Sequence, residues 1–130
     1  MLVQCGVCVS MLHDTNIMHR DIKLANFLVN RKDSKYTVVI SDFGVAVSSE
    51  NKESVRASGC VGTTSYKAPE LYSVKTGETY GMEVDVYSFG VVMWELLSGK
   101  SRYWHLHNLM KNKDGDGQKL DDWMRGNNGQ

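Results

Sequence analysis

Residues 17–29 read IMHRDIKLANFLV and hold the most chemically distinctive cluster of the chain. Asp21, Lys23 and Asn26 lie close together there, and a run of β-forming residues, Phe-Leu-Val, follows directly. Charged and amide side chains beside a hydrophobic strand are typical of sites that handle phosphate groups and metal ions, which need cations and hard oxygen donors. The sequence therefore predicts a loop with phosphate or metal chemistry immediately before a strand.

A helix is expected before this loop and a hairpin after it. Apolar residues within positions 2–13 recur at helical spacing, which predicts an amphipathic helix. The stripe consists of Val3, Val7 and Met11, with Cys5, Cys8 and Leu12 beside it. Residues 27–30 and 36–41 are rich in β-formers and are separated by the polar sequence RKDSK, a pattern that predicts a β-hairpin.

The second predicted helix covers residues 83–99. Its apolar residues surround almost the whole circumference, so we expect it to be central and buried. They are Val86, Phe89, Val91, Val92, Met93, Trp94, Leu96 and Leu97. Asp85 stands at the expected N-cap and Gly99 at the expected C-cap.

The remaining segments are less regular. Residues 44–68 are rich in Ser, Gly and Lys without periodicity, and an irregular stretch of that length inside a domain predicts a functional loop. Short helices are expected at residues 104–110 and 120–124.

Composition excludes several classes of protein. The chain has 130 residues, enough for one domain, and its 15 basic residues balance its 15 acidic residues, so nothing favours nucleic acid or an anionic membrane as a partner. Three cysteines without a framework spacing fit a reducing compartment, and the apolar start lacks the features of a signal peptide. We expect a cytoplasmic protein.

The CGVC sequence at residues 5–8 has redox or zinc spacing but lies on the predicted helix without a second ligand pair, so we interpret both cysteines as core residues.

Four sequence motifs follow one another along the chain. They are HRDIKLAN (19–26), SDFG (41–44), GTTSYKAPE (62–70) and DVYSFGVVMWELLSG (85–99). Together they resemble the C-terminal lobe of a eukaryotic protein kinase. The resemblance covers residues 1–100 and leaves 101–130 as a poorly matched tail. It implies a mainly α fold with a small β-hairpin, a partial kinase domain from which the N-terminal lobe is absent.

The resemblance assigns the catalytic and cofactor roles. Asp21 would orient or deprotonate the substrate hydroxyl, and Lys23 would neutralise the transferring phosphate. Asn26 and Asp42 would hold Mg²⁺ together with the phosphates of ATP, because hard oxygens suit this ion. Leu28 resembles the residue that forms the floor of the adenine pocket.

Other motif residues are expected to support the site. His19 and Phe43 would pack as hydrophobic elements, and Asp85 would anchor the backbone of the HRD loop. Glu70 would pair with an Arg that the family carries further along, for which this chain has no clear counterpart. Gly44 would give the chain freedom to turn beside Asp42.

The regulatory residues lie around the irregular segment. Arg20 would pair with a phosphate on that loop, and Ser58 lies closest to the position that the family commonly uses. Phosphorylation near Ser58 by an upstream kinase is therefore a hypothesis for activation. Lys23 and Thr63 resemble serine/threonine-directed kinases, although the last motif resembles the tyrosine-kinase-like group.

The function that follows is transfer of phosphate from Mg-ATP to a serine or threonine hydroxyl of a protein substrate, by a complete kinase domain. The Gly-rich loop, strand Lys and helix Glu that clamp ATP have no counterpart in this sequence, so we expect the isolated chain to be inactive. A lobe-only protein that binds or competes without turnover, or an incomplete gene model, remains the alternative interpretation.

Overall fold

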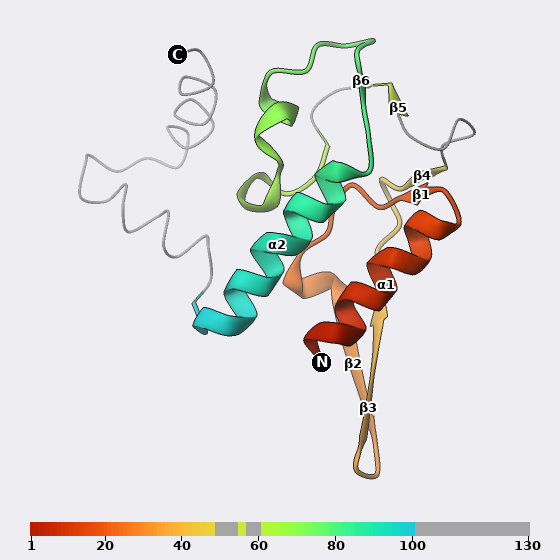
Figure 1. The fold of residues 1–130 in the computed structure, drawn as a ribbon, viewed down its shortest axis with the longest axis vertical. Coiled ribbons are helices and arrows are strands. Elements are labelled where there is room, and N and C mark those ends of the chain that lie inside the picture. Colours follow the sequence, from red (N-terminus) through yellow and green to blue (C-terminus); the bar gives the residue numbers. More distant parts are fainter. Residues whose placement is uncertain (49–54, 57–60, 101–130) are drawn as a thin grey trace, which may run out of the picture.

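Two helices form the longest elements of the computed structural model, which describes residues 1–48, 55–56 and 61–100 (Figure 1). Helix α1 (Leu2–Asp14) packs against helix α2 (Glu83–Ser98), and a long hairpin extends from the region between them. The hairpin consists of β2 (Phe27–Lys32) and β3 (Lys35–Ile40). Ser58 and the helices expected at 104–110 and 120–124 lie outside the described residues.

Strand pairing is more extensive than the single hairpin that the sequence predicted. The described residues form three two-stranded antiparallel sheets, β1–β4, β2–β3 and β5–β6. The additional strands are β1 (Ile17–Met18), β4 (Val47–Ser48), β5 (Val55–Arg56) and β6 (Thr79–Tyr80). The described residues also form short 3-10 helices, which are η1 (Leu24–Asn26), η2 (Thr64–Tyr66) and η3 (Pro69–Tyr72). A strand of two residues is too short to show periodicity, so these pairs were missed.

The predicted hairpin is confirmed, with a first strand that extends to Lys32 instead of residue 30 and a second strand that is shifted by one residue. Its ladder runs from Phe27↔Ile40 to Lys32↔Lys35, which leaves a two-residue turn where Asp33 has a φ of 55°. One face of the hairpin turns Phe27 and Val38 into the core. The opposite face carries the cross-strand pair Leu28↔Val39, and both of these side chains are about half exposed.

The predicted apolar stripe of α1 faces away from the described core. Val3, Val7 and Met11 are exposed, whereas Cys5 and Val9 are buried against the hairpin and α2. The helix carries two neighbouring apolar stripes, and spacing alone does not say which of them meets a partner. The interpretation as a core residue is confirmed for Cys5, whereas Cys8 is partly buried against the same core and its thiol donates a hydrogen bond to the carbonyl of Val38.

Helix α2 is buried on one face only, so the prediction of burial all round is wrong. Val86, Trp94 and Leu97 are exposed by 58%, 39% and 77%. The inward face instead includes polar residues, because Ser88 and Glu95 form hydrogen bonds with the segment that carries η2. None of the helices in the described ranges is both long and apolar enough to cross a membrane.

The two ends of α2 differ in how well the sequence predicted them. The helix begins at Glu83 with Met82 as its N-cap, so Asp85 lies in the first turn and the predicted cap is wrong. The Asp85 carboxylate is directed to a distant loop, and it is therefore not available to cap its own helix. Gly99 is confirmed as the C-terminal cap, with a φ of 65° and an N–H that donates to the Glu95 carbonyl.

Tyr66 connects η2 to the inward face of α2. Its hydroxyl donates to the Glu95 carboxylate over 2.6 Å, and Glu95 is only 5% exposed. Burial and this hydrogen bond both raise the pKa of the Tyr66 phenol, so it stays a donor at neutral pH. The Ser88 hydroxyl donates to the Tyr66 carbonyl over 2.8 Å and fixes the same turn.

Replacing Tyr66 with Phe should therefore destabilise the fold. Removing a donor from a buried carboxylate is expected to lower the free energy of unfolding by about 1–3 kcal/mol, measured by urea denaturation. Tyr36→Phe removes the same hydroxyl from a half-exposed ring and should change stability by less than about 0.5 kcal/mol. Equal losses in the two variants would contradict this account.

Candidate active site

The loop that follows β1 is fixed by a buried carboxylate from α2. The Asp85 side chain accepts hydrogen bonds from the backbone N–H of His19 at 2.7 Å and from that of Arg20 at 2.8 Å. Asp85 is 1% exposed. Arg20 has a φ of 65°, a left-handed conformation that costs a non-glycine residue about 1–2 kcal/mol and needs such support. The sequence-predicted support residue thus contacts the backbone of the HRD loop.

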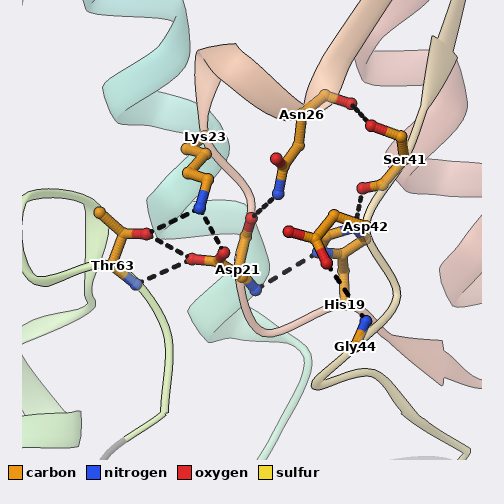
Figure 2. Close-up of polar contacts among 8 residues, drawn as sticks. All are labelled: His19, Asp21, Lys23, Asn26, Ser41, Asp42, Gly44 and Thr63. Atoms are coloured by element: carbon orange, nitrogen blue, oxygen red, sulfur yellow. Dashed lines mark hydrogen bonds and ion pairs between the residues drawn. The ribbon is translucent and has the colours of Figure 1, made fainter.

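Asp21, Lys23 and Thr63 form a closed polar triangle (Figure 2). The Lys23 ammonium donates to one carboxylate oxygen of Asp21 at 2.6 Å and to the Thr63 hydroxyl at 3.1 Å. The other carboxylate oxygen accepts from both the hydroxyl and the backbone N–H of Thr63, at 2.7 and 2.8 Å. Lys23 reaches Asp21 from an extended backbone, with φ −154° and ψ 160°.

This triangle keeps Asp21 ionised. Partial burial raises the pKa of the carboxyl, but the hydrogen bonds from Lys23 and Thr63 together outweigh burial, and the net pKa of Asp21 is lowered. Because the folded-state pKa lies below the unfolded value, the carboxylate contributes stability above its ordinary pKa, and this contribution is lost as the pH falls through the lowered value. At neutral pH the group is a hydrogen-bond acceptor.

Asn26 and Asp42 supply oxygen atoms on the neighbouring side of the loop. Asn26 is 5% exposed, and its amide nitrogen donates to the Asp21 carbonyl at 2.9 Å. Its side-chain oxygen has no hydrogen-bond partner within the described residues. Asp42 is exposed and has a φ of 65°, and one of its carboxylate oxygens accepts the Gly44 N–H at 3.4 Å. The chain was expected to turn with the help of Gly44, but the left-handed conformation occurs at Asp42 itself.

His19 is buried as expected, whereas Phe43 is 47% exposed and lies outside the core clusters, so the expected core packing of Phe43 is not found in the described residues. His19 is fully buried, with one ring nitrogen 3.0 Å from the Ser41 carbonyl and the other accepting the N–H of Asp21 at 3.3 Å. Its ring centroid lies 5.1 Å from that of Phe43. Both ring nitrogens are thus engaged by the backbone, which leaves the imidazole poorly suited to proton transfer.

The Arg20 side chain forms its hydrogen bonds with residues outside the triangle. Its Nε–H donates to the Val45 carbonyl at 2.6 Å, and its guanidinium donates to the Tyr80 hydroxyl at 3.1 Å. Of the other predicted residues, Glu70 is exposed at the start of η3 and Leu28 lies on the outer face of the hairpin. The structure therefore brings Asp21, Lys23 and Thr63 into direct contact and leaves Glu70 apart from them.

Gly62 and His13 also support the site, although neither was predicted from the sequence. Gly62 has a φ of 87°, and a Cβ atom there would lie 2.5 Å from the Arg20 carbonyl oxygen. His13 lies in the last turn of α1 with its ring nitrogen 3.1 Å from the Asp85 carboxylate. The glycine before Thr63 was visible as part of the third motif, whereas nothing in the helical pattern marks His13.

Gly62→Ala should displace the loop that carries Asp21. Gly77→Ala is a matched control, since Gly77 also has a positive φ, 93°, but has open space around the position of a Cβ. The two variants share the cost of a left-handed alanine, and Gly62→Ala adds a backbone clash of about 1–3 kcal/mol. Urea denaturation should show this difference, and equal free energies of unfolding for the two variants would refute the close approach.

Comparison with known proteins agrees with this geometry. The chain matches the family model of the protein kinase domain over residues 1–125. It is 38% identical to a bovine phosphorylase b kinase gamma catalytic chain, liver/testis isoform, over 105 residues that cover 78% of this chain and 25% of the relative.

Two further relatives are similar at the same level. A meiosis-specific serine/threonine-protein kinase of Schizosaccharomyces pombe is 41% identical over 99 residues, which cover 69% of this chain and 22% of the relative. Protein kinase C-like 1 of Caenorhabditis elegans is 39% identical over 97 residues, covering 75% and 13%. The chain spans about a quarter of the length of the first relatives that it matches. A match of this extent, joined to the arrangement around Asp21, shows that the chain belongs to the protein kinase domain family.

Proposed function

We propose that the protein, as part of a complete kinase domain, transfers the γ-phosphoryl group of ATP to serine or threonine hydroxyls of protein substrates. The observation that carries this proposal is the triangle of Asp21, Lys23 and Thr63, in which an ionised carboxylate lies 2.6 Å from an ammonium group. Relatives that are named as serine/threonine-protein kinases support the choice of a serine or threonine hydroxyl as the acceptor. The contact of Thr63 with both charged groups supports it as well, since Thr63 is the residue whose motif resembles serine/threonine-directed enzymes.

Asp21 is suited to orienting the acceptor hydroxyl. Its lowered pKa makes it a weak base, so it holds the hydroxyl by accepting a hydrogen bond and takes the proton late. This suits phosphoryl transfer through a loose transition state, in which the attacking oxygen needs position more than early deprotonation. Lys23, held beside Asp21, neutralises negative charge on the transferred group.

The side-chain oxygen atoms of Asn26 and Asp42 are suitable ligands for a magnesium ion. The buried side-chain oxygen of Asn26, which has no partner in the described part of the chain, and the exposed carboxylate of Asp42 are hard oxygen ligands. These two residues would hold the ion, and the bound metal would neutralise charge on the nucleotide phosphates.

The outer face of the hairpin provides a surface for the nucleotide base. Leu28 and Val39 face each other across the strands and leave a half-exposed apolar pair. An aromatic base is apolar on its faces, so this pair is suited to contact adenine from below. Leu28 lies on β2, the strand that follows Asn26, and Val39 lies on the paired strand β3, so the surface for the base is adjacent in sequence to the proposed metal ligand Asn26.

The finer assignments are also part of this proposal. We assign residues 1–130 to part of a kinase domain, with the described residues as its C-terminal lobe and the last motif of tyrosine-kinase-like type. Arg20 retains N–H groups beyond the two that contact Val45 and Tyr80, so it can also receive a phosphate that an upstream kinase places near Ser58. The balanced charge and the cysteine usage support a cytoplasmic location.

In a complete kinase domain, Asp42→Asn should weaken binding of Mg-ATP. Asparagine tolerates the left-handed backbone but removes the negative charge from the metal site, so we expect at least about a tenfold loss of affinity in magnesium-dependent ATP titration calorimetry. Asp33→Asn is the matched control, because Asp33 is exposed with a φ of 55° in the hairpin turn. Equal affinities in both variants would exclude Asp42 as a metal ligand.

In a complete kinase domain, Asp21→Asn should slow phosphate transfer strongly and leave ATP binding intact. We expect the rate of ³²P transfer from ATP to a generic protein acceptor such as casein to fall by about 10²–10⁴-fold, as for loss of a positioned acid-base group. ATP affinity should change by less than about twofold, because Asp21 contacts the hydroxyl side of the reaction. A wild-type protein that captures acceptor proteins without transferring phosphate would instead support the binding or competing module.

A further inference from the structure

One edge of the β2–β3 hairpin is covered by α1. Side chains of this helix donate hydrogen bonds to two carbonyls of β3, the Gln4 amide to that of Tyr36 at 3.0 Å and the Cys8 thiol to that of Val38 at 3.4 Å. Strand β3 therefore lies next to α1, and β2 forms the opposite edge of this two-stranded sheet. Figure 1 shows the hairpin projecting beyond both helices.

The pairing register shows which backbone groups of β2 point away from β3. In an antiparallel ladder, residue pairs that exchange hydrogen bonds alternate with pairs whose N–H and C=O groups point outward. The carbonyls of Tyr36 and Val38 are turned to α1, so these two residues belong to the outward pairs. Their partners across the ladder are Arg31 and Val29, whose N–H and C=O groups therefore point outward on the other side, along the edge of β2.

These outward groups of β2 have no hydrogen-bond partner within the described residues. Val29 is 48% exposed, and Arg31 is exposed as well, so solvent reaches the backbone there. An unpaired edge of this kind is a template for another extended chain, which adds to the sheet as a further strand through backbone hydrogen bonds.

Positive charge gathers at the same edge. Arg31 and Lys32 lie on β2, and Lys35 lies directly across from Lys32 on β3. None of these cations forms an ion pair within the described ranges, and the Arg31 guanidinium lies over an aromatic ring while its Nε–H donates to a backbone carbonyl of the turn. Asp33 is the one acidic residue of the segment 27–40, so the hairpin carries surplus positive charge in a chain whose overall charge is balanced.

We propose that the edge of β2 binds an acidic, extended peptide segment of another protein, which adds to the hairpin as a third strand antiparallel to β2. The backbone groups of Val29 and Arg31 pair with this strand. Its residues opposite Arg31 and Lys32 are acidic, and its residue opposite Val29 is apolar and β-branched, because cross-strand pairs of these kinds stabilise a sheet. This binding does not depend on the proposed phosphoryl transfer.

A second copy of the chain fits this edge less well than an acidic peptide. Strand β2 has the sequence FLVNRK, which contains no carboxylate, so a second β2 strand cannot neutralise Arg31 and Lys32. Cations on an edge strand also oppose its pairing with another cationic strand. The charge of the edge therefore favours an acidic partner over self-association.

The probe is the synthetic peptide fluorescein-Thr-Glu-Glu-Thr-Val-Thr-amide, added to the whole chain. In antiparallel register its glutamates lie opposite Lys32 and Arg31, and its valine lies opposite Val29. A second peptide carries N-methyl groups on the second glutamate and on the valine, which removes the N–H groups that would pair with β2. A third peptide has lysine in place of both glutamates, which reverses the charge and keeps the backbone.

Amide hydrogen exchange, followed by NMR, reports on the edge directly. In the free protein the amides of Leu28 and Asn30 should exchange slowly because they bond to β3, whereas those of Val29 and Arg31 should exchange rapidly. A saturating amount of the acidic peptide should slow exchange at Val29 and Arg31 by at least about tenfold and leave Leu28 and Asn30 unchanged. The N-methylated peptide and the lysine peptide should protect neither edge amide.

Fluorescence anisotropy measures the contribution of charge to the affinity. The double variant Arg31→Glu/Lys32→Glu should bind the acidic peptide at least about tenfold more weakly. Lys75→Glu/Lys100→Glu is the matched control, because it changes the net charge equally at exposed positions outside the hairpin. This control should alter the affinity by less than about twofold, since distant exposed charges are screened by salt.

Val29→Pro tests the backbone contribution from the side of the protein. Proline removes an N–H that points outward and leaves the bonds between β2 and β3 in place, a position where an edge strand tolerates it. The affinity for the acidic peptide should fall by about tenfold. If this variant does not fold, the N-methylated peptide tests the same hydrogen bonds with the wild-type protein.

The exchange pattern decides between the possible occupants of the edge. Protection of Val29 and Arg31 by the acidic peptide alone supports the proposal. Slow exchange of these amides in the free protein that depends on protein concentration would identify a second copy as the partner. Slow exchange independent of concentration would show that another part of the chain covers the edge, and no protection by any peptide would show that the cations only keep the edge unpaired. Each of these last three results would overturn the proposal.

Discussion

The buried carboxylate of Asp85 is the interaction on which the site depends. It lies 66 residues from His19 in the sequence, yet it accepts the amides of His19 and Arg20 and so joins the first turn of α2 to the loop after β1. A charge with 1% exposure is costly to bury unless hydrogen bonds replace the lost water. Two amides and the His13 ring provide those bonds, and in return the loop is held in a conformation that Arg20 would not adopt unaided.

The chemistry near Asp21 also depends on hydrogen bonds that offset the cost of burying a charged carboxylate. Asp21 is partly buried, but Lys23 and Thr63 stabilise its ionised form more than burial opposes it, and its pKa falls. Asn26 contributes differently, because its amide nitrogen holds the loop while its oxygen has no hydrogen-bond partner within the described residues. The Asp21 carboxylate and the Lys23 ammonium thus lie on one side of the loop, and the side-chain oxygens of Asn26 and Asp42 lie on the other.

The support beneath the site is polar as well as hydrophobic. Tyr66 and Ser88 tie the segment after Thr63 to α2, with Glu95 as a buried acceptor. Gly62 lets this segment approach the Arg20 carbonyl, which a side chain at that position would prevent. These contacts explain why Thr63 lies within reach of Asp21 although the two are 42 residues apart.

The sequence by itself determined the helices, the hairpin, the C-terminal cap at Gly99 and the family, because periodicity, turn chemistry and motifs are local properties. It also singled out Asp21, Lys23 and Thr63. It could not determine which apolar stripe of α1 is buried, that Glu95 faces inward, or that Asp85 serves the loop instead of its own helix. Those choices depend on which partner each face meets, and the two-residue strands and the contact of His13 with Asp85 exist only once segments distant in sequence are packed together.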